Sequence, residues 1–159
     1  MTWTAAVVCA STRAATGVYA DRTGPLIVAA LREWGYDVGD AVVVADGEPV
    51  GDAIRDAITA DVSVVLTTGG TGVSPTDLTP EMTRRHVDRE IPGIAEAIRA
   101  AGVAKGVPTA MLSRGLAGVT RHTLVVNLPG STGGVKDALA VLADVVPHVM
   151  DQLAGVDHR

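Results

Sequence analysis

One stretch constrains the fold more than any other, because residues 62–79 pass from an apolar run into glycines and hydroxyls. Val62 to Leu66 is too short for a helix and rich in β-branched Val, which predicts a buried strand of a parallel sheet. Glycine-rich chain beyond such a strand can bring backbone N–H groups close to an anion. Open α/β sheets bind ligands at this carboxyl edge, so we expect the rest of the chain to support a site there.

The composition predicts a globular fold and excludes some partners. The 159 residues suit one domain over 1–159, with 47% hydrophobic and 19% charged residues. The net charge of -5 argues against a nonspecific nucleic-acid binder but allows a phosphorylated small molecule as ligand. No apolar run approaches the roughly 20 residues of a membrane span, and we expect neither a signal peptide nor a membrane partner.

The single cysteine, Cys9, rules out a disulfide framework within one chain and predicts a reducing, cytoplasmic setting. It lies in an apolar run, so we expect a buried strand residue rather than a nucleophile.

The first half of the chain alternates strands with helices. We expect strands at 4–10, 42–45 and 62–66, and helices at 24–35 and 52–60 between them. That alternation predicts a parallel sheet covered on both faces. We expect residues 11–23 to form a loop and residues 46–49 a turn. Ser11, Asp46 and Asp77 each follow a predicted strand, so their loops should meet at one edge of the sheet.

The second half predicts a different arrangement. A short helix should start at Thr79, and a longer one should cover 91–104. An apolar segment at 109–112 follows, and the strands at 116–119 and 123–128 look paired and antiparallel, which makes the sheet mixed. The predicted helices at 132–142 and 143–153 close the chain, with a break or kink at Pro147.

The loop Gly69-Gly70-Thr71-Gly72 is a candidate phosphate cradle. It matches neither the Walker pattern nor the dinucleotide fingerprint, and a plain tight turn is the alternative. Asp46 and Asp77 could together hold Mg²⁺ beside a triphosphate, the alternative being turn or capping carboxylates.

Further polar groups follow later strands. Ser113-Arg114 is a candidate phosphate contact or a solvated strand end. Asn127 and Ser131 flank Pro129-Gly130 before a helix, whose N-terminus is a second anion site unless Ser131 is an ordinary cap. The four histidines show no ligand spacing, so we expect them to be surface or structural residues: His86, His122, His148 and His158.

Four motifs in this order resemble the MogA/MoaB family of molybdenum-cofactor biosynthesis and the similar gephyrin G domain. They are Thr-Thr-Gly-Gly-Thr-Gly (67–72), Asp-Leu-Thr-Pro-Glu (77–81), Ser-Arg (113–114) and Asn-Leu-Pro-Gly-Ser (127–131). The resemblance covers nearly the whole chain. It implies a three-layer α/β/α fold with a mostly parallel, mixed sheet, assembled as a trimer or hexamer.

The resemblance also implies an activity: a molybdopterin adenylyltransferase, which moves AMP from MgATP to molybdopterin, releases pyrophosphate and hands its product to the molybdenum-insertion enzyme. Asp46 and Asp77 match the essential acidic positions, which we expect to be catalytic and to hold Mg²⁺. The remaining expected contacts to nucleotide and pterin are Ser11, Thr68, Gly69, Gly70, Thr71, Gly72, Ser113, Arg114, Asn127, Pro129, Gly130 and Ser131.

Two positions depart from the family pattern: Thr76 stands where most relatives carry Arg, and Thr132 where they carry Pro. Arg22, Arg84 or Arg114 could supply the missing charge. The main alternative is therefore a molybdopterin- or nucleotide-binding protein without transferase activity. Another reaction on the same scaffold and a purely structural subunit are weaker alternatives, since a single domain with all four motifs favours the stand-alone enzyme.

Overall fold

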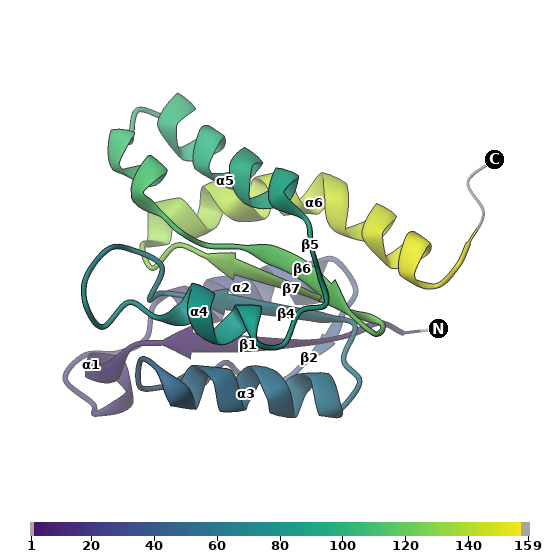
Figure 1. Cartoon of the computed structure of the whole chain (residues 1–159), viewed down its shortest axis with the longest axis horizontal. Coiled ribbons are helices and arrows are strands. Elements are labelled where there is room, and N and C mark those ends of the chain that lie inside the picture. The colour runs from purple at the N-terminus through teal and green to yellow at the C-terminus, as the bar shows by residue number, and fades with distance from the viewer. Residues whose placement is uncertain (1, 157–159) are drawn as a thin grey trace.

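A computed structural model describes residues 2–156 as a seven-stranded mixed sheet between two helical layers (Figure 1). The strands run in the order β2-β1-β4-β7-β6-β5, and β3 also pairs with β1. Their bounds are β1 Thr4–Ala10, β2 Asp37–Val38, β3 Val42–Val44, β4 Val64–Thr68, β5 Arg89–Glu90, β6 Ala117–Thr120 and β7 Thr123–Leu128. The pairs of β1, β4 and β7 are parallel, whereas β6 pairs antiparallel with β5 and β7. The predicted fold class is confirmed.

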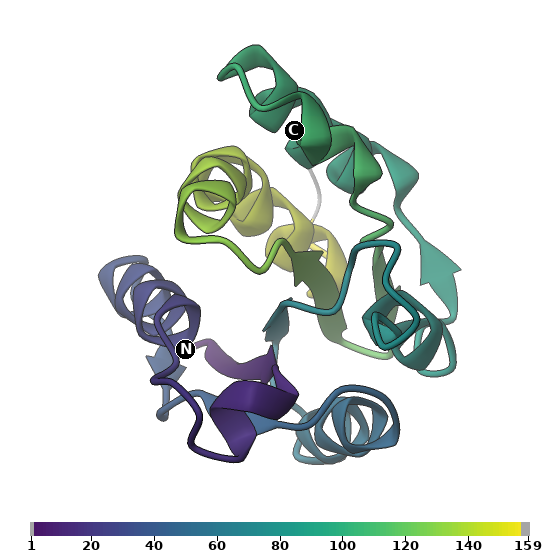
Figure 2. The ribbon, with the colours of Figure 1, turned by 90° about the vertical axis from the view of Figure 1, so that its left-hand side faces the viewer.

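Helices cover both faces of the sheet, as the view onto the carboxyl ends of its parallel strands shows (Figure 2). One face carries α2 (Thr23–Glu33), α5 (Pro92–Ala104) and α6 (Thr132–Leu153), and the other carries α3 (Glu48–Thr59) and α4 (Thr79–Arg84). The short α1 (Thr12–Ala15) and the 3₁₀-helix η1 (Pro108–Leu112) lie in connections.

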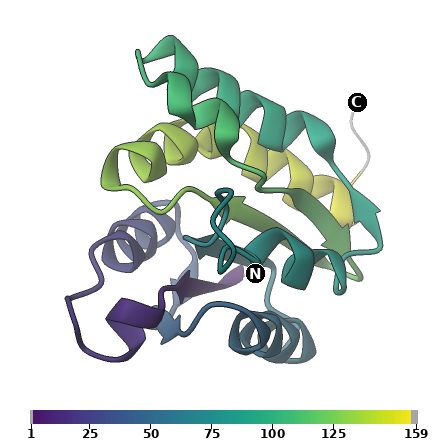
Figure 3. The same ribbon diagram turned by 60° about the vertical axis from the view of Figure 1, so that its left-hand side comes forward.

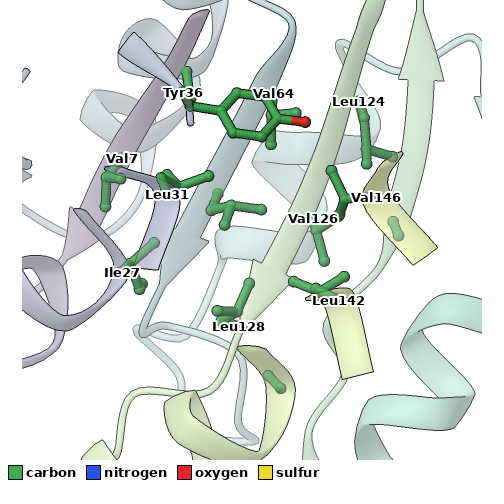
Figure 4. Packing of buried hydrophobic residues seen from close by; sticks show 14 of the residues in the cluster. Val7, Ile27, Leu31, Tyr36, Val64, Leu124, Val126, Leu128, Leu142 and Val146 are labelled. Carbon is green, nitrogen blue, oxygen red and sulfur yellow. The ribbon is translucent and has the colours of Figure 1, made fainter. Parts of the chain in front are cut away.

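The core follows the alternation of side chains along each strand. On β7, Leu124, Val126 and Leu128 pack toward α2 and α6, whereas Val125 belongs to the cluster beneath α3 and α4. Figure 4 shows Val126 beside Leu142 of α6. A strand buried on both faces reads as a continuous apolar run, which is why the central strands could be predicted from sequence.

The prediction of separate helices at 132–142 and 143–153 was wrong, because α6 is a single helix of 22 residues that continues through Pro147 without a break. Proline removes one donor, to the carbonyl of Ala143, and both residues lie on the exposed side where water can satisfy that carbonyl. Val146 and Met150, at most 1% exposed, hold the helix against the sheet on the opposite side.

Other boundaries also differ from the predictions. Residues 12–15 form α1 instead of loop, because the Ser11 hydroxyl accepts a hydrogen bond from Ala14 N–H at 3.2 Å and caps a helical turn. Helix α3 begins at Glu48, inside the predicted turn, because Pro49 suits the first turn of a helix. Strand β4 begins two residues later than predicted, and β2 and β5 are too short to produce a sequence pattern.

Among residues 2–156, no helix has both the length and the apolar character that crossing a bilayer requires.

Candidate functional site

Two open cavities adjoin at the carboxyl edge of the parallel strands. Figure 3 shows the ribbon at this edge, with α1 and the loop between β4 and α4. The first has a volume of about 790 Å³ and the second about 590 Å³. Gly70, Asp77 and Gly130 line both, so the two cavities share a wall.

Most of the expected site residues line one or both of these cavities. Ser11, Asp46, Thr68 and Gly69 line the first, together with the shared Asp77, so the three loops expected to meet do so. The second cavity is lined by Thr71, Gly72, Ser113, Pro129 and Ser131.

Asp46 is held through one of its two carboxylate oxygens. Its Oδ2 accepts hydrogen bonds from the N–H and hydroxyl of Thr12, at 3.2 and 2.9 Å. The Thr12 hydroxyl in turn accepts from the Asp46 N–H at 3.2 Å. Within residues 2–156, Oδ1 of Asp46 has no hydrogen-bond partner.

Asp77 likewise has one carboxylate oxygen in a hydrogen bond and one without a partner among the described residues. Its Oδ2 accepts from Ser74 N–H at 3.1 Å, whereas Oδ1 has no partner in the described part of the chain. Two carboxylates that line one cavity and each have one oxygen without a partner suit Mg²⁺, which binds to one or two carboxylates plus phosphate oxygens and water. Among the described residues, no group of three or more His, Cys, Asp or Glu could hold a metal ion by itself. A Mg²⁺ ion at this site would therefore need phosphate oxygens and water as its other ligands.

The glycine loop needs glycine at two positions. Gly69 and Gly70 have φ values of 86° and 66°, which side chains rarely adopt. A side chain at Gly69 would overlap the carbonyl oxygen of Ala10, and one at Gly70 would overlap Thr79 Oγ1. In residues 2–156 the N–H groups of Gly70, Thr71 and Gly72 have no hydrogen-bond partner, so the loop offers three donors to a ligand.

Neighbouring hydroxyls connect this loop and the end of β4 to the segments that follow β7 and η1. The Thr68 hydroxyl donates to the Pro129 carbonyl at 2.7 Å, and the Ser113 hydroxyl donates to Thr71 Oγ1 at 3.3 Å. Ser131 caps α6 by accepting from Gly134 N–H at 3.0 Å, so the capping alternative holds even though Ser131 lines the second cavity.

Arg114 does not line either cavity, unlike the phosphate contact expected from sequence. Its guanidinium donates to the carbonyls of Gly72 and Asp77, at 2.8 and 2.7 Å, and to the carboxylate of Glu81. Arg114 therefore connects Gly72 and Asp77, the two ends of the segment 72–77, to Glu81 of α4.

Asn127 also lies outside both cavities, because its buried side chain, 3% exposed, is used within the protein. Its Oδ1 accepts from Leu116 N–H at 3.1 Å, and its Nδ2 donates to the hydroxyls of Thr67 and Thr83, both at 2.9 Å. The amide therefore joins β7 to β4, α4 and the start of the β6 region.

Sequence reasoning missed Thr12 and Arg13. The Thr12 contact to Asp46 spans 34 positions and has no local signal. Arg13 and Arg22 both line the first cavity, and neither guanidinium has a hydrogen-bond or ion-pair partner within residues 2–156. They are therefore available to balance negative charge there, whereas Arg114 is already engaged.

Cys9 is buried at the end of β1, as predicted, and lies beside Asp21. Burial, with the hydrogen bond to Asp21 at 3.3 Å and the negative charge of Asp21, raises the pKa of the Cys9 thiol to about 12. A raised pKa keeps the thiol protonated at neutral pH, which fits a buried strand residue better than a nucleophile. Of the histidines, His158 lies outside the described residues, and the other three belong to no metal-binding group within them.

The fold and the two cavities define a three-layer α/β domain with an open site at the edge of its sheet, and comparison with known proteins identifies its family. Residues 6–148 match the family described as "Probable molybdopterin binding domain". The chain belongs to this family.

Known relatives share both sequence and fold with the chain. A structure of the molybdopterin biosynthesis Mog protein from Mycobacterium ulcerans is 52% identical, with a TM-score of 0.92 over 98% of this chain and 99% of that one. The molybdopterin adenylyltransferase of Helicobacter pylori is 34% identical over 94% of this chain and 86% of its own length.

A bifunctional molybdenum-cofactor biosynthesis protein of Synechococcus elongatus is 39% identical over 97% of this chain. This chain spans only 48% of that relative.

Proposed function

We propose that this protein is a molybdopterin adenylyltransferase, which transfers AMP from ATP to the phosphate of molybdopterin and releases pyrophosphate. Relatives named for this activity align with nearly the whole chain. The observation that carries the proposal is the wall between the cavities, where Asp77 presents a free carboxylate oxygen beside the unpartnered N–H groups of the glycine loop.

Two adjoining cavities suit a reaction between two substrates. The first cavity contains the unpaired Arg13 and Arg22 and the carboxylate of Asp46, which suits a triphosphate with its cation. The second cavity would then receive the pterin, with its phosphate directed toward the shared wall at Gly70 and Asp77. Holding both reactants in one geometry is a large part of what such a site can contribute.

In the proposed reaction, an oxygen of the molybdopterin phosphate attacks the α-phosphorus of ATP, and the bond from that phosphorus to the pyrophosphate oxygen breaks. Asp46 and Asp77 would hold Mg²⁺, which neutralises the phosphate charge when bound. The N–H groups of Gly70, Thr71 and Gly72 would donate to the phosphate oxygens as charge develops. In this proposal the protein positions the two substrates and stabilises the phosphate charge, and it forms no covalent intermediate.

A second candidate is a binding protein without transfer activity, because Thr76 lines the first cavity at a position where the resemblance to the family leads us to expect Arg. Arg13 and Arg22 favour the enzyme, since they supply positive charge to the same cavity. We further propose a cytoplasmic homo-oligomer, a trimer or hexamer of one domain, that hands its product to the molybdenum-insertion enzyme.

A label-transfer experiment tests the proposal. The protein is mixed with molybdopterin, Mg²⁺ and ATP labelled at either the α- or the γ-phosphate. We expect α-label in adenylyl-molybdopterin and γ-label only in pyrophosphate. Binding of both substrates without any α-label transfer would reject the enzyme in favour of the binding protein.

A further inference from the structure

Thr79, the first residue of α4, has a buried hydroxyl with no hydrogen-bond partner in the described part of the chain. The residue is only 1% exposed. Its backbone is anchored without the hydroxyl, because its N–H donates to the Gly70 carbonyl at 3.0 Å and its carbonyl accepts from the Thr83 hydroxyl at 2.8 Å. Burying an unpaired hydroxyl destabilises a fold, so a structural role does not explain this one.

The hydroxyl and the free oxygen of Asp46 both lie close to the backbone of Gly70. A side chain added to Gly70 would overlap Thr79 Oγ1 and would lie 3.2 Å from Asp46 Oδ1. Both oxygen atoms therefore lie close to the same point beside Gly70, where the glycine carries no side chain. Gly70 itself lines both cavities, so this point lies directly behind the shared wall.

We propose that Thr79 is a positioning residue for Asp46, and that its hydroxyl donates to Oδ1 once a nucleotide with its cation engages the glycine loop. The inference rests on the proposed function. Thr12 already holds Oδ2 from the other side, so Thr79 would complete the fixation of the carboxylate. A hydroxyl that donates to a carboxylate makes a strong, charge-assisted bond. Thr79 itself does not touch the reacting atoms.

The substitution Thr79→Val tests this role, because Val keeps the shape of Thr and removes the hydroxyl. We expect the ligand-free variant to unfold at the same temperature as the wild type or higher, since an unpaired buried polar group is lost. Calorimetric titration with ATP and Mg²⁺ should show binding weakened by about tenfold, the loss of one charged hydrogen bond. Binding of ATP in EDTA should be unchanged, and Thr79→Ser should restore the Mg²⁺-dependent binding.

Thr83→Val is the matched control, because Thr83 lies one turn later in α4 and has a buried hydroxyl with partners. That hydroxyl donates to Thr79 and accepts from Asn127. We expect Thr83→Val to lower the unfolding temperature and to leave the Mg²⁺ dependence of ATP binding at its wild-type value. The two variants should therefore show opposite patterns.

Three results would overturn the inference: a Thr79→Val variant that is clearly destabilised or unfolded, wild-type affinity for ATP with Mg²⁺ in that variant, or wild-type ATP binding that does not depend on Mg²⁺. Failure of the proposed function looks different. A wild type that binds ATP with Mg²⁺ dependence but forms no adenylyl product would reject the transferase, while the loss of binding in Thr79→Val would still support the role of Thr79.

Discussion

Thr12 and Asp46, 34 positions apart, form three hydrogen bonds with each other, which join α1 to the turn after β3. Thr12 donates to one oxygen of the carboxylate with both its N–H and its hydroxyl, at 3.2 and 2.9 Å. The other oxygen stays available to a cation in the first cavity. The orientation of this carboxylate is therefore set by a side chain from another loop.

Thr12→Val should reduce adenylyl transfer, because it removes the hydroxyl that donates to Asp46 and leaves the backbone bond in place. We expect kcat/KM to fall by about tenfold, the scale of one hydrogen bond to a charged group. Thr16→Val is the control, since the Thr16 hydroxyl donates only to backbone carbonyls of α1. Equal losses in both variants would show that α1 as a whole, and not the contact to Asp46, matters.

Thr76→Arg should strengthen ATP binding, because Thr76 lines the first cavity and a guanidinium there could pair with phosphate. We expect the Kd for ATP to fall by about three- to tenfold at low salt, with a smaller gain at high salt because of screening. Thr76→Gln adds length without charge and should leave the Kd near the wild-type value. If Thr76→Arg and Thr76→Gln changed the Kd for ATP equally, the added charge would contribute nothing, and Arg13 and Arg22 would already supply enough positive charge.

Asn127→Ala should destabilise the fold, because the buried amide bridges Leu116, Thr67 and Thr83. The substitution leaves the N–H of Leu116 without its partner. We expect the free energy of unfolding, measured by urea titration, to fall by about 2 kcal/mol. The exposed Thr109→Ala should change the free energy of unfolding by less than about 0.5 kcal/mol. An unchanged midpoint in Asn127→Ala would mean that the network contributes nothing to stability.

The contact between Glu81 and Arg114 should make stability depend on acid pH. Burial opposes ionisation of Glu81, but hydrogen bonds from Arg114 and from its own backbone, with the charges of Arg114 and Arg84, lower its pKa below the usual 4.5. A lowered pKa in the folded state gives stability that is present above the unfolded value and lost as the pH falls through the folded value. Wild type should therefore exceed Glu81→Gln in stability at pH 7, and the difference should vanish in strong acid. A difference that persists unchanged there would contradict this assignment.

The sequence predicted the features that depend on local pattern. Val62 to Leu66 indicated a buried strand, and Gly69 and Gly70 do occupy backbone conformations that favour glycine. The meeting of Asp46 and Asp77 along one cavity followed from the parallel order of strands alone.

Features that depend on tertiary contacts could not be predicted. The motif positions of Asn127 and Arg114 suggested ligand contacts. In the structure, Asn127 instead joins β7 to β4, and Arg114 binds the backbone of the loop at Gly72. Pro147 suggested a break, but the packing of Val146 against the sheet keeps α6 continuous. In each case the partner is remote in sequence, so no local pattern carries the information.

The most direct test of the central claim is the rate of adenylyl transfer in Asp77→Asn, the residue on the wall shared by both cavities. Asn can still accept the bond from Ser74 N–H through its amide oxygen, so we expect the fold and the unfolding temperature to be retained. We predict that transfer of α-label to molybdopterin falls by at least about a hundredfold, because the variant loses the negative charge that we propose as a ligand of Mg²⁺. Transfer at the wild-type rate by folded Asp77→Asn would contradict the account.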